Sequence, residues 1–333
     1  MAHNNVSIFV AHVGCPNICS FCNQHTISGS QSAPTIDEVR STCEMAFNQI
    51  EDKSNTEIAF FGGSFTAIEK SYMVALLECV QDFIGKDKFI GIRVSTRPDC
   101  ITSEILDILK KYNVTAIELG CQSMKDSVLT ANRRGHTAQD VYNACELIKS
   151  YGFELGLQMM VGLYTSTIQD EYYTMNEIIK LNPKTVRIYP TVVLKGTHLD
   201  ELMQSGEYKL YSLDTMVDIC SDFLTQFNNS GINVIKCGLH SSELVEAEMT
   251  GGYYHPAFRE LCESRIYRNI IESIVKENPN RVNNTYSIFV SSRYISMATG
   301  QKKSNIKHFK DRGILLSILG ADNLNKYECL LIK

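Results

Sequence analysis

Residues 154–160 (ELGLQMM) form a short, nearly continuous apolar run, which is typical of a strand buried on both faces of a parallel sheet. An amphipathic helical pattern follows at residues 168–181, and a second apolar run follows at residues 185–189. A strand, a helix and a strand in this order predict a right-handed crossover between parallel neighbours. This unit decides the fold class, because it recurs along most of the chain.

The same alternation extends from residue 6 to about residue 239. Further strands are expected at residues 6–13, 57–61, 90–95, 116–119 and 233–237, and further helices at residues 36–50, 70–84, 103–112, 138–151 and 213–228. Thr35 followed by Glu38 predicts a capping box at the start of the first of these helices. Six or seven strand–helix units favour an α/β fold, a partial or full (β/α) TIM-like barrel with parallel strands. Ligands then belong at the carboxyl ends of the strands.

Beyond residue 240 the alternation ends. A polar link leads to a long helical pattern at residues 258–276, a strand at 286–290, a helix with a basic cluster, and short strands at 315–319 and 327–332. We therefore predict a barrel core at residues 1–240 and a small C-terminal α+β domain at residues 241–333.

Composition narrows the class of protein. Of 333 residues, 44% are hydrophobic and 21% are charged, which excludes a disordered chain. The net charge of −5 argues against a protein that binds polyanions over its whole surface, although a local basic face stays possible. The sequence has neither an apolar run of the roughly 18 residues that a membrane span needs nor a signal-like N-terminus. We expect a soluble cytoplasmic protein.

Twelve cysteines fall into two groups. Nine are dispersed and are expected to be buried structural residues: Cys43, Cys79, Cys100, Cys121, Cys145, Cys220, Cys237, Cys262 and Cys329. The other three, Cys15, Cys19 and Cys22, follow the first expected strand with C-x3-C-x2-C spacing. Three soft thiolates on one loop suit an iron–sulfur cluster or another soft metal. A structural zinc site completed by His12 or His25 is the alternative.

This spacing, with Phe21 before the last cysteine, resembles the signature of the radical S-adenosyl-L-methionine (SAM) superfamily. The resemblance implies a [4Fe–4S] cluster held by Cys15, Cys19 and Cys22, whose open iron chelates SAM. It implies an enzyme that reductively cleaves SAM to methionine and a 5′-deoxyadenosyl radical, which abstracts a hydrogen atom. It also implies an electron donor such as flavodoxin or ferredoxin.

Other residues match the SAM contacts of this superfamily by position. Gly62-Gly63-Ser64 stands at the end of the second expected strand, where the superfamily has a turn that contacts the SAM amino group, and Ser64 replaces a common acidic residue. The remaining matches are Gln122 and Gln158 for the ribose, Arg134 or its neighbour Arg133 for the carboxylate, and Ser95 at another strand end. No residue is assigned a catalytic role on the substrate.

Within the superfamily, several segments resemble the radical SAM core of Elp3, the catalytic subunit of Elongator: residues 95–99 (STRPD), 118–123 (ELGCQS), 133–137 (RRGHT), 187–191 (RIYPT) and 195–197 (KGT). The resemblance covers roughly residues 6–270, and residues 251–265 resemble the radical-SAM C-terminal domain. Elp3 proteins also carry an acetyltransferase domain and modify wobble uridine in tRNA. We expect no such domain here, because only about 90 residues follow the barrel. Weaker similarity runs to oxygen-independent coproporphyrinogen oxidases.

A basic segment at residues 301–312 has two interpretations, which lead to different classes of substrate. Its cations, with Arg293, could form a phosphate-binding face for RNA, or they could be the solvated side of a helix whose Ile306 and Phe309 pack inward. Three functions compete: a radical SAM enzyme acting on tRNA or another RNA, the same chemistry on a small or tetrapyrrole-like substrate, and a non-catalytic protein stapled by a metal.

Overall fold

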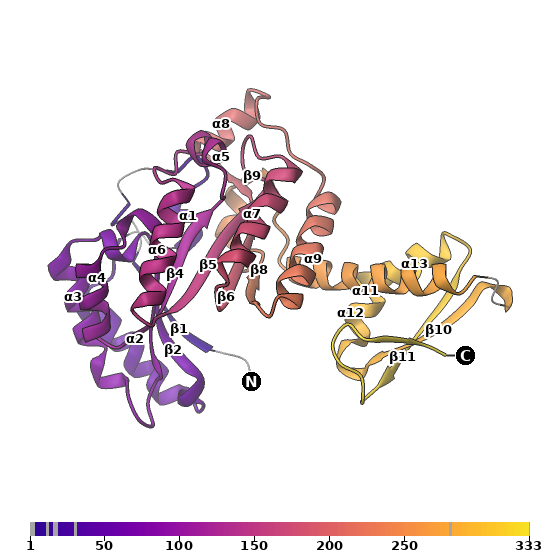
Figure 1. Ribbon diagram of the computed structural model, residues 1–333, viewed down its shortest axis with the longest axis horizontal. Helices are drawn as coiled ribbons and strands as arrows, with labels where there is room; N and C mark the ends of the chain where they lie inside the picture. The colour runs from indigo at the N-terminus through magenta and orange to yellow at the C-terminus, as the bar shows by residue number, and fades with distance from the viewer. Residues whose placement is uncertain (1–3, 11–12, 16–18, 30–31, 280–281, 333) are drawn as a thin grey trace. The chain divides into compact units, whose positions relative to one another are not determined.

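The larger sheet is built of parallel strands that lie side by side in nearly the order in which they occur in the sequence (Figure 1). The computed structural model describes residues 4–10, 13–15, 19–29, 32–279 and 282–332. The sheet order is β1-β2-β3-β4-β5-β6-β8, and the pairs from β1 to β6 are parallel. The strands are β1 (Asn4–Val10), β2 (Thr56–Gly62), β3 (Gly91–Thr96), β4 (Val114–Gln122), β5 (Glu154–Val161), β6 (Thr185–Pro190) and β8 (Asn233–Cys237). Because β1 and β8 are both edges, the sheet is an open, curled half-barrel, and the predicted partial (β/α) barrel is confirmed.

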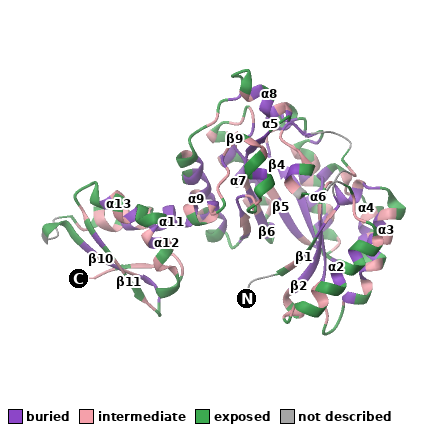
Figure 2. Ribbon diagram, turned by 180° about the vertical axis from the view of Figure 1, so that it is seen from behind, coloured by how far each residue is buried: buried purple, intermediate pink, exposed green. Residues whose placement is uncertain are grey.

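Helices alternate with these strands as the periodicity predicts. They are α2 (Ile36–Gln49), α3 (Lys70–Cys79), α4 (Ser103–Lys111), α6 (Ala138–Ser150), α7 (Ile168–Leu181) and α9 (Leu213–Asn229). Figure 2 shows buried residues concentrated on the strands and exposed residues along the outer sides of helices such as α2 and α3. The predicted capping box is present, since the Glu38 amide donates to Thr35 Oγ1 at 3.3 Å and the Thr35 amide donates to Glu38 Oε2 at 2.7 Å. Among the described residues, no helix is long and apolar enough to span a membrane.

Some expected boundaries differ from the structure. The strand expected at residues 6–13 ends at Val10, and its residues 11–12 lie outside the described residues. The helix expected at residues 70–84 ends at Cys79 and is followed by a 3-10 turn. The Gln81 side chain donates to the Leu77 carbonyl at 2.8 Å and to the Tyr112 carbonyl at 3.0 Å, which closes the helix end early. Six short elements were not expected: α1 (Gln24–Ser28), α5 (Asp126–Ala131), α8 (His198–Gln204), α10 (Glu243–Glu248), β7 (Val192–Leu194) and β9 (Met249–Gly252).

The chain forms two compact units. Unit 1 comprises Met1–Leu210, Ile232–Ile235 and Ser242–Tyr254, and unit 2 comprises Tyr211–Gly231, Lys236–Ser241 and His255–Lys333. The predicted single division at residue 240 stays a prediction.

Unit 2 holds a second, smaller sheet of order β11-β10-β12. Strand β10 (Thr285–Ser291) pairs parallel with β11 (Leu315–Ala321) and antiparallel with β12 (Cys329–Leu331). Its helices are α11 (Phe258–Glu277), α12 (Ile295–Thr299) and α13 (Ser304–Lys310), besides α9. Buried side chains from the helices and the sheet, including Tyr267, Ile288 and Phe309, form one apolar cluster. Phe309 therefore packs inward, as the amphipathic pattern predicts.

A buried ion network crosses the middle of the half-barrel. Glu118 of β4 receives two hydrogen bonds from Arg187 of β6, at 2.6 and 2.9 Å, and lies 3.4 Å from Arg93 of β3. Arg93 also pairs with Glu57 of β2 at 2.7 Å and with Glu154 of β5 at 2.9 Å. The side chains of Glu118 and Arg93 are only 1% and 3% exposed. Burial alone would raise the pKa of Glu118, but Arg187 and Arg93 outweigh burial and hold this pKa below its usual value.

We predict that Glu118→Gln lowers the free energy of unfolding by about 3–5 kcal/mol, because it leaves buried guanidinium groups without their anion. Urea unfolding of the apoprotein measures the change. Glu104→Gln is the matched control, since Glu104 pairs with Lys70 on an exposed surface, where solvent screening makes the loss of an ion pair cost little. Equal effects of the two substitutions would contradict this account of the network.

A second buried carboxylate gives the fold a dependence on pH. Glu171 of α7 is buried and accepts a hydrogen bond from the Gly162 amide at 2.7 Å. Burial raises the pKa of Glu171 from 4.5 to about 7, and the Gly162 hydrogen bond only partly opposes this. The folded chain therefore holds a proton that the unfolded chain loses above pH 4.5, and this contribution to stability disappears as pH rises through 7.

We predict that Glu171→Gln removes this pH dependence while it keeps an oxygen to accept from Gly162. Relative to the wild type, the variant should gain roughly 2–3 kcal/mol of unfolding free energy on going from pH 5 to pH 8. Urea unfolding at both pH values measures the gain, and Glu146→Gln on the exposed side of α6 serves as the control. If the difference in unfolding free energy between wild type and Glu171→Gln is the same at pH 5 and pH 8, Glu171 does not have the raised pKa assigned to it.

Candidate active site

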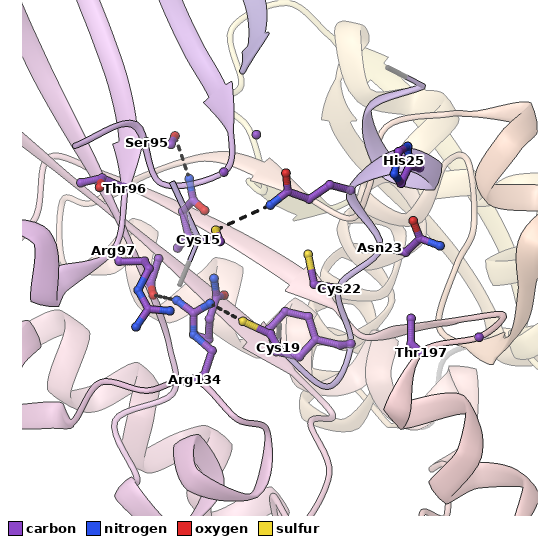
Figure 3. A pocket seen from close by; sticks show the side chains of 18 residues that line it. Cys15, Cys19, Cys22, Asn23, His25, Ser95, Thr96, Arg97, Arg134 and Thr197 are labelled. Carbon is purple, nitrogen blue, oxygen red and sulfur yellow. Dashed lines mark hydrogen bonds between the residues drawn. The ribbon is translucent and has the colours of Figure 1, made fainter. Parts of the chain in front are cut away.

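A cavity of about 470 Å³ lies at the carboxyl ends of the central strands, beside the cysteine loop (Figure 3). Nine of the ten residues proposed from the sequence line it: Cys15, Cys19, Cys22, Gly62, Gly63, Ser95, Gln122, Arg134 and Gln158. The tenth, Ser64, is buried beside the cavity, where its hydroxyl lies 2.8 Å from Thr96 Oγ1 and accepts from the Arg97 amide at 3.2 Å. The structure thus brings together residues from segments that are up to 143 positions apart, as Cys15 and Gln158 are.

Two glycines allow the cysteine loop to lie against the turn after β2. A Cβ on Gly63 would stand 2.3 Å from the Val13 carbonyl, and a Cβ on Gly14 would stand 2.4 Å from the Ser64 carbonyl. Gly14 also has φ +81°, which glycine adopts without strain. The two backbone segments therefore approach more closely than any residue with a side chain would permit.

Hydrogen bonds hold the far side of the cysteine loop. The Ser20 amide donates to the Asn132 carbonyl at 3.1 Å, and the Ser20 hydroxyl donates to Asn132 Oδ1 at 2.8 Å. The Ser20 carbonyl accepts from the Leu199 amide at 2.8 Å. The loop that carries the thiols is thus fixed at both ends, to the turn after β2 and to the ends of α5 and α8.

The three thiols differ in exposure, but they lie close enough together that neighbouring thiols affect the pKa of Cys15 and of Cys22. Cys19 is buried, Cys22 is half-buried and Cys15 is exposed. The pKa of Cys22 is raised to about 12, chiefly by burial and in addition by Cys19 and Cys15, because neighbouring thiolates repel one another. Thiolates crowded in this way need cationic charge beside them, and a metal centre supplies it. The donor set therefore fits a thiolate-bound metal cluster.

Arg134 supplies part of that cationic charge. Its Nη1 donates to Cys19 Sγ at 3.1 Å, and its Nη2 donates to the Gly120 carbonyl at 2.6 Å (Figure 3). Gln24 Nε2 lies 3.6 Å from Cys15 Sγ on the other side of the loop. Two of the three cysteines thus receive an N–H donor from a side chain that also lines the cavity.

Three buried polar atoms of cavity-lining residues have no hydrogen-bond partner within the part of the chain that the structure describes: Gln122 Oε1, Arg134 Nε and Arg97 Nη1. Buried polar atoms are nearly always paired in folded proteins. The rest of the Arg97 guanidinium is bound bidentately by Asp99, at 2.9 and 2.7 Å. The cavity therefore offers both donors and an acceptor to a polar ligand.

A bulge at the end of β4 places Gln122 in the cavity wall. The pairing of β4 with β5 shifts between Gly120 and Gln122, and Gln122 has φ +62°. Such bulges redirect a side chain and are common next to active sites. Gln158 and Ser95 line the same cavity, and Gln158 Nε2 donates to Glu118 Oε2 at 2.9 Å and to Ser95 Oγ at 3.3 Å. The ion network therefore supports two of the predicted SAM contacts from below.

Sequence reasoning missed several residues of the wall. Arg97, Asn23, Gln24 and Thr197 line the cavity without having been proposed as ligands. Arg97 had a usable signal, because it follows an expected strand at the carboxyl end. His25, one of the histidines considered for zinc, is exposed, and His12 lies outside the described residues.

The comparisons with known proteins agree with this geometry. The profile of the Radical SAM superfamily matches residues 10–178, and that of the Radical_SAM C-terminal domain matches residues 183–268. The chain belongs to the radical SAM superfamily. Membership of this superfamily gives the chain a [4Fe–4S] cluster and SAM as its cofactors. The superfamily assignment decides between the iron–sulfur and zinc hypotheses in favour of iron–sulfur.

Elp3 proteins are among the relatives. The chain is 32% identical over 190 residues to Elongator complex protein 3 of Saccharomyces cerevisiae, which covers 50% of this chain and 34% of the relative. It is 27% identical over 185 residues to the tRNA uridine(34) acetyltransferase of Methanocaldococcus infernus, covering 50% and 35%. The match thus spans about a third of each relative's length. The solved structure of Methanocaldococcus infernus Elp3 shares the fold, with a TM-score of 0.56 at 20% identity, covering 74% of this chain and 61% of that one.

We predict that Gly63→Ala lowers the iron bound after anaerobic reconstitution by at least about half, because the new methyl group pushes the cysteine loop away from the turn after β2. Iron and sulfide per chain measure the effect. Gly152→Ala is the control, since a Cβ there meets open space; Gly152, unlike Gly63, has a positive φ, so this variant carries backbone strain without a steric clash. Iron retained in Gly63→Ala at the level of Gly152→Ala would show that this close contact does not seat the loop.

Proposed function

We propose that the chain cleaves SAM reductively at a [4Fe–4S] cluster held by Cys15, Cys19 and Cys22, and that it modifies an RNA. One observation carries the first half of the proposal. The three thiols face the same cavity as three buried, unpartnered polar atoms from Gln122, Arg134 and Arg97. A cluster beside a polar ligand site is the arrangement that SAM chemistry requires.

Different residues of the cavity wall are assigned to different groups of SAM, and the first set binds its methionyl part. Gly62 and Gly63 leave their backbone open to the SAM methionyl group, because neither carries a side chain. Arg134, held by the Gly120 carbonyl, offsets the negative charge at Cys19 and keeps its Nε free to donate to an anion. Arg97 Nη1 offers a second donor to the SAM carboxylate.

The sugar of SAM is assigned to the opposite part of the wall. Gln122 Oε1 is a buried acceptor for a ribose hydroxyl, while Ser95 and Gln158 provide polar groups already oriented by Glu118. Ser64 acts indirectly, through the Thr96 and Arg97 ends of β3. Cys15, Cys19 and Cys22 would hold the cluster, which when reduced would supply the one electron for cleavage of SAM to methionine and a 5′-deoxyadenosyl radical. A donor protein such as flavodoxin or ferredoxin would then reduce the oxidised cluster again.

An RNA substrate is supported by the relatives and by charge. The curated relatives include proteins named tRNA uridine(34) acetyltransferase, and the shared half of this chain contains the radical SAM core. In a chain of net charge −5, residues 301–312 hold five lysine and arginine residues and one acidic residue. A local cationic segment of this kind suits a phosphate backbone.

We predict that the reduced, reconstituted protein releases 5′-deoxyadenosine from SAM and that total RNA raises the release severalfold over the RNA-free background. Liquid chromatography with mass detection measures the nucleoside. RNA digested to nucleosides tests whether the polymer is needed. Release that no RNA stimulates would contradict the RNA substrate but leave SAM cleavage standing.

The cysteine assignment is tested in the same assay. Cys19→Ala should lose both the cluster absorbance and 5′-deoxyadenosine release, because two thiolates do not hold the cluster. Cys329→Ala, at a dispersed and half-buried cysteine, should retain both. SAM cleavage by Cys19→Ala at the wild-type rate would overturn the ligand assignment.

A further inference from the structure

Two short helices joined by a tight loop connect the parallel strands β10 and β11 of unit 2. Strand β10 leads into α12, residues 300–303 form the loop, and α13 leads into β11 through a turn in which the Ile314 amide donates to the Phe309 carbonyl at 3.0 Å. We call residues 300–303, Gly-Gln-Lys-Lys, the lysine loop. The radical site in unit 1 uses none of these residues.

The lysine loop has an unusual backbone. Lys302 and Lys303 are both in the left-handed region, with φ of +52° and +60°. Few residues other than glycine adopt this region, and two in succession are rarer still. Gly300 has φ +80°, and a Cβ there would stand 2.4 Å from Ser304 Oγ and 2.8 Å from Ser264 Oγ. The loop is therefore a tight turn that requires glycine at its first position and strains the lysines at its third and fourth positions.

Buried polar contacts hold this turn in place from below. Asn305 is 2% exposed, and its Nδ2 donates to the Ala298 carbonyl at 2.9 Å and to the Ser264 carbonyl at 2.9 Å. These bonds join the start of α13 to the end of α12 and to α11. The lysine loop is thus pinned by the body of unit 2, and its strain is maintained by the surrounding structure.

The side chains on the outside of the loop are cationic. Lys302, Lys303, Lys307 and Lys310 are exposed, and in the described part of unit 2 they form no ion pair with a carboxylate. Asp311 is the acidic residue of this segment. Arg312 differs, because it contacts His308, which itself pairs with Glu272. Four lysines therefore project from one loop and one helix face without carboxylate partners there.

Next to this cationic face lies a strand with groups suited to bases. β11 is an edge of its sheet, so one side of its backbone has no strand neighbour in the described sheet. Leu315 and Leu319 of β11 are 56% and 41% exposed, with the exposed Ser317 between them. Free backbone groups bind base edges by hydrogen bonds, and exposed apolar side chains contact base faces.

We propose that the lysine loop, α13 and β11 bind single-stranded RNA, with the phosphates on the lysines and the bases against β11. In KH modules a Gly-x-x-Gly loop clamps the backbone of four nucleotides. Here Gly300 matches the first glycine, and Lys303, at the position of the last, adopts the left-handed conformation that glycine adopts most readily. The proposal rests on the RNA substrate proposed above and adds the site and the strandedness of the RNA that the chain recognises.

The test measures binding of the reconstituted full chain to a fluorescent single-stranded 12-nucleotide RNA by anisotropy. Lys302→Gln/Lys303→Gln should weaken binding about tenfold at low salt and reduce the dependence of log affinity on log salt by about 1.4, as expected when two phosphate contacts are lost from a single strand. Lys110→Gln/Lys111→Gln, two adjacent exposed lysines of α4 in unit 1, should change neither quantity. Glutamine at position 303 has the same backbone strain as lysine, so the loop is expected to keep its shape.

Three results would overturn the proposal: equal loss in the two double variants, equal affinity for a duplex of the same sequence, or equal competition by an acidic polypeptide of the same charge. If the loop variant melts below the wild type, Lys307→Gln/Lys310→Gln on α13 replaces it, with a severalfold loss expected and no loss contradicting the site. SAM cleavage without RNA is measured in each variant. A loop variant that still cleaves SAM but no longer binds RNA supports the lysine loop as the RNA site. A wild-type protein that binds RNA but does not cleave SAM would refute only the radical function.

Discussion

The half-barrel depends on one buried carboxylate, Glu118. Its two oxygens receive hydrogen bonds from Arg187 and Gln158, and Arg93 lies beside them. A carboxylate loses several kcal/mol of hydration in such a place, and only a complete set of donors offsets the loss. Gly156 makes room for it, because a Cβ there would stand 2.8 Å from Glu118 Cγ. The charge thus fixes which residues of β3, β4, β5 and β6 lie opposite one another.

This register carries over to the active site. Ser95 lies directly opposite Glu118, and Gln158 lies directly opposite Arg187. A slip of one residue would turn Gln158 to the other face of the sheet and leave Glu118 without one of its donors. The same interaction that satisfies the buried charge therefore also orients the polar floor of the cavity, and stability and ligand binding share one network.

The sequence predicted the parts of the fold that local pattern controls. Apolar runs and helical periodicity located the strands of the half-barrel, and the capping box at Thr35 marked a helix start. The cysteine spacing predicted the metal ligands, since the three candidates lie within eight residues of one another. Features made by distant contacts were not predictable. The bulge at Gln122 and the assignment of α9 to unit 2 depend on packing against segments far away in the chain.

Gln158 shows where the two kinds of information meet. An amide in the run at residues 154–160 signalled a buried polar role, because such a group needs partners. Its partners, Ser95 and Glu118, come from strands 63 and 40 positions earlier, which no local pattern reveals. The sequence therefore identified the residue, and only the structure identified what holds it.

The positive charge of residues 301–312 contrasts with the negative net charge of the chain. The chain as a whole is acidic, with a net charge of −5, while residues 301–312 carry five lysine and arginine residues against one aspartate. At physiological ionic strength charges act over only about 8 Å. A phosphate near the lysine loop is therefore attracted by the loop, and the acidic remainder of the surface discourages binding elsewhere. The proposed docking of RNA at the lysine loop therefore rests on local charge and needs no net positive charge on the chain.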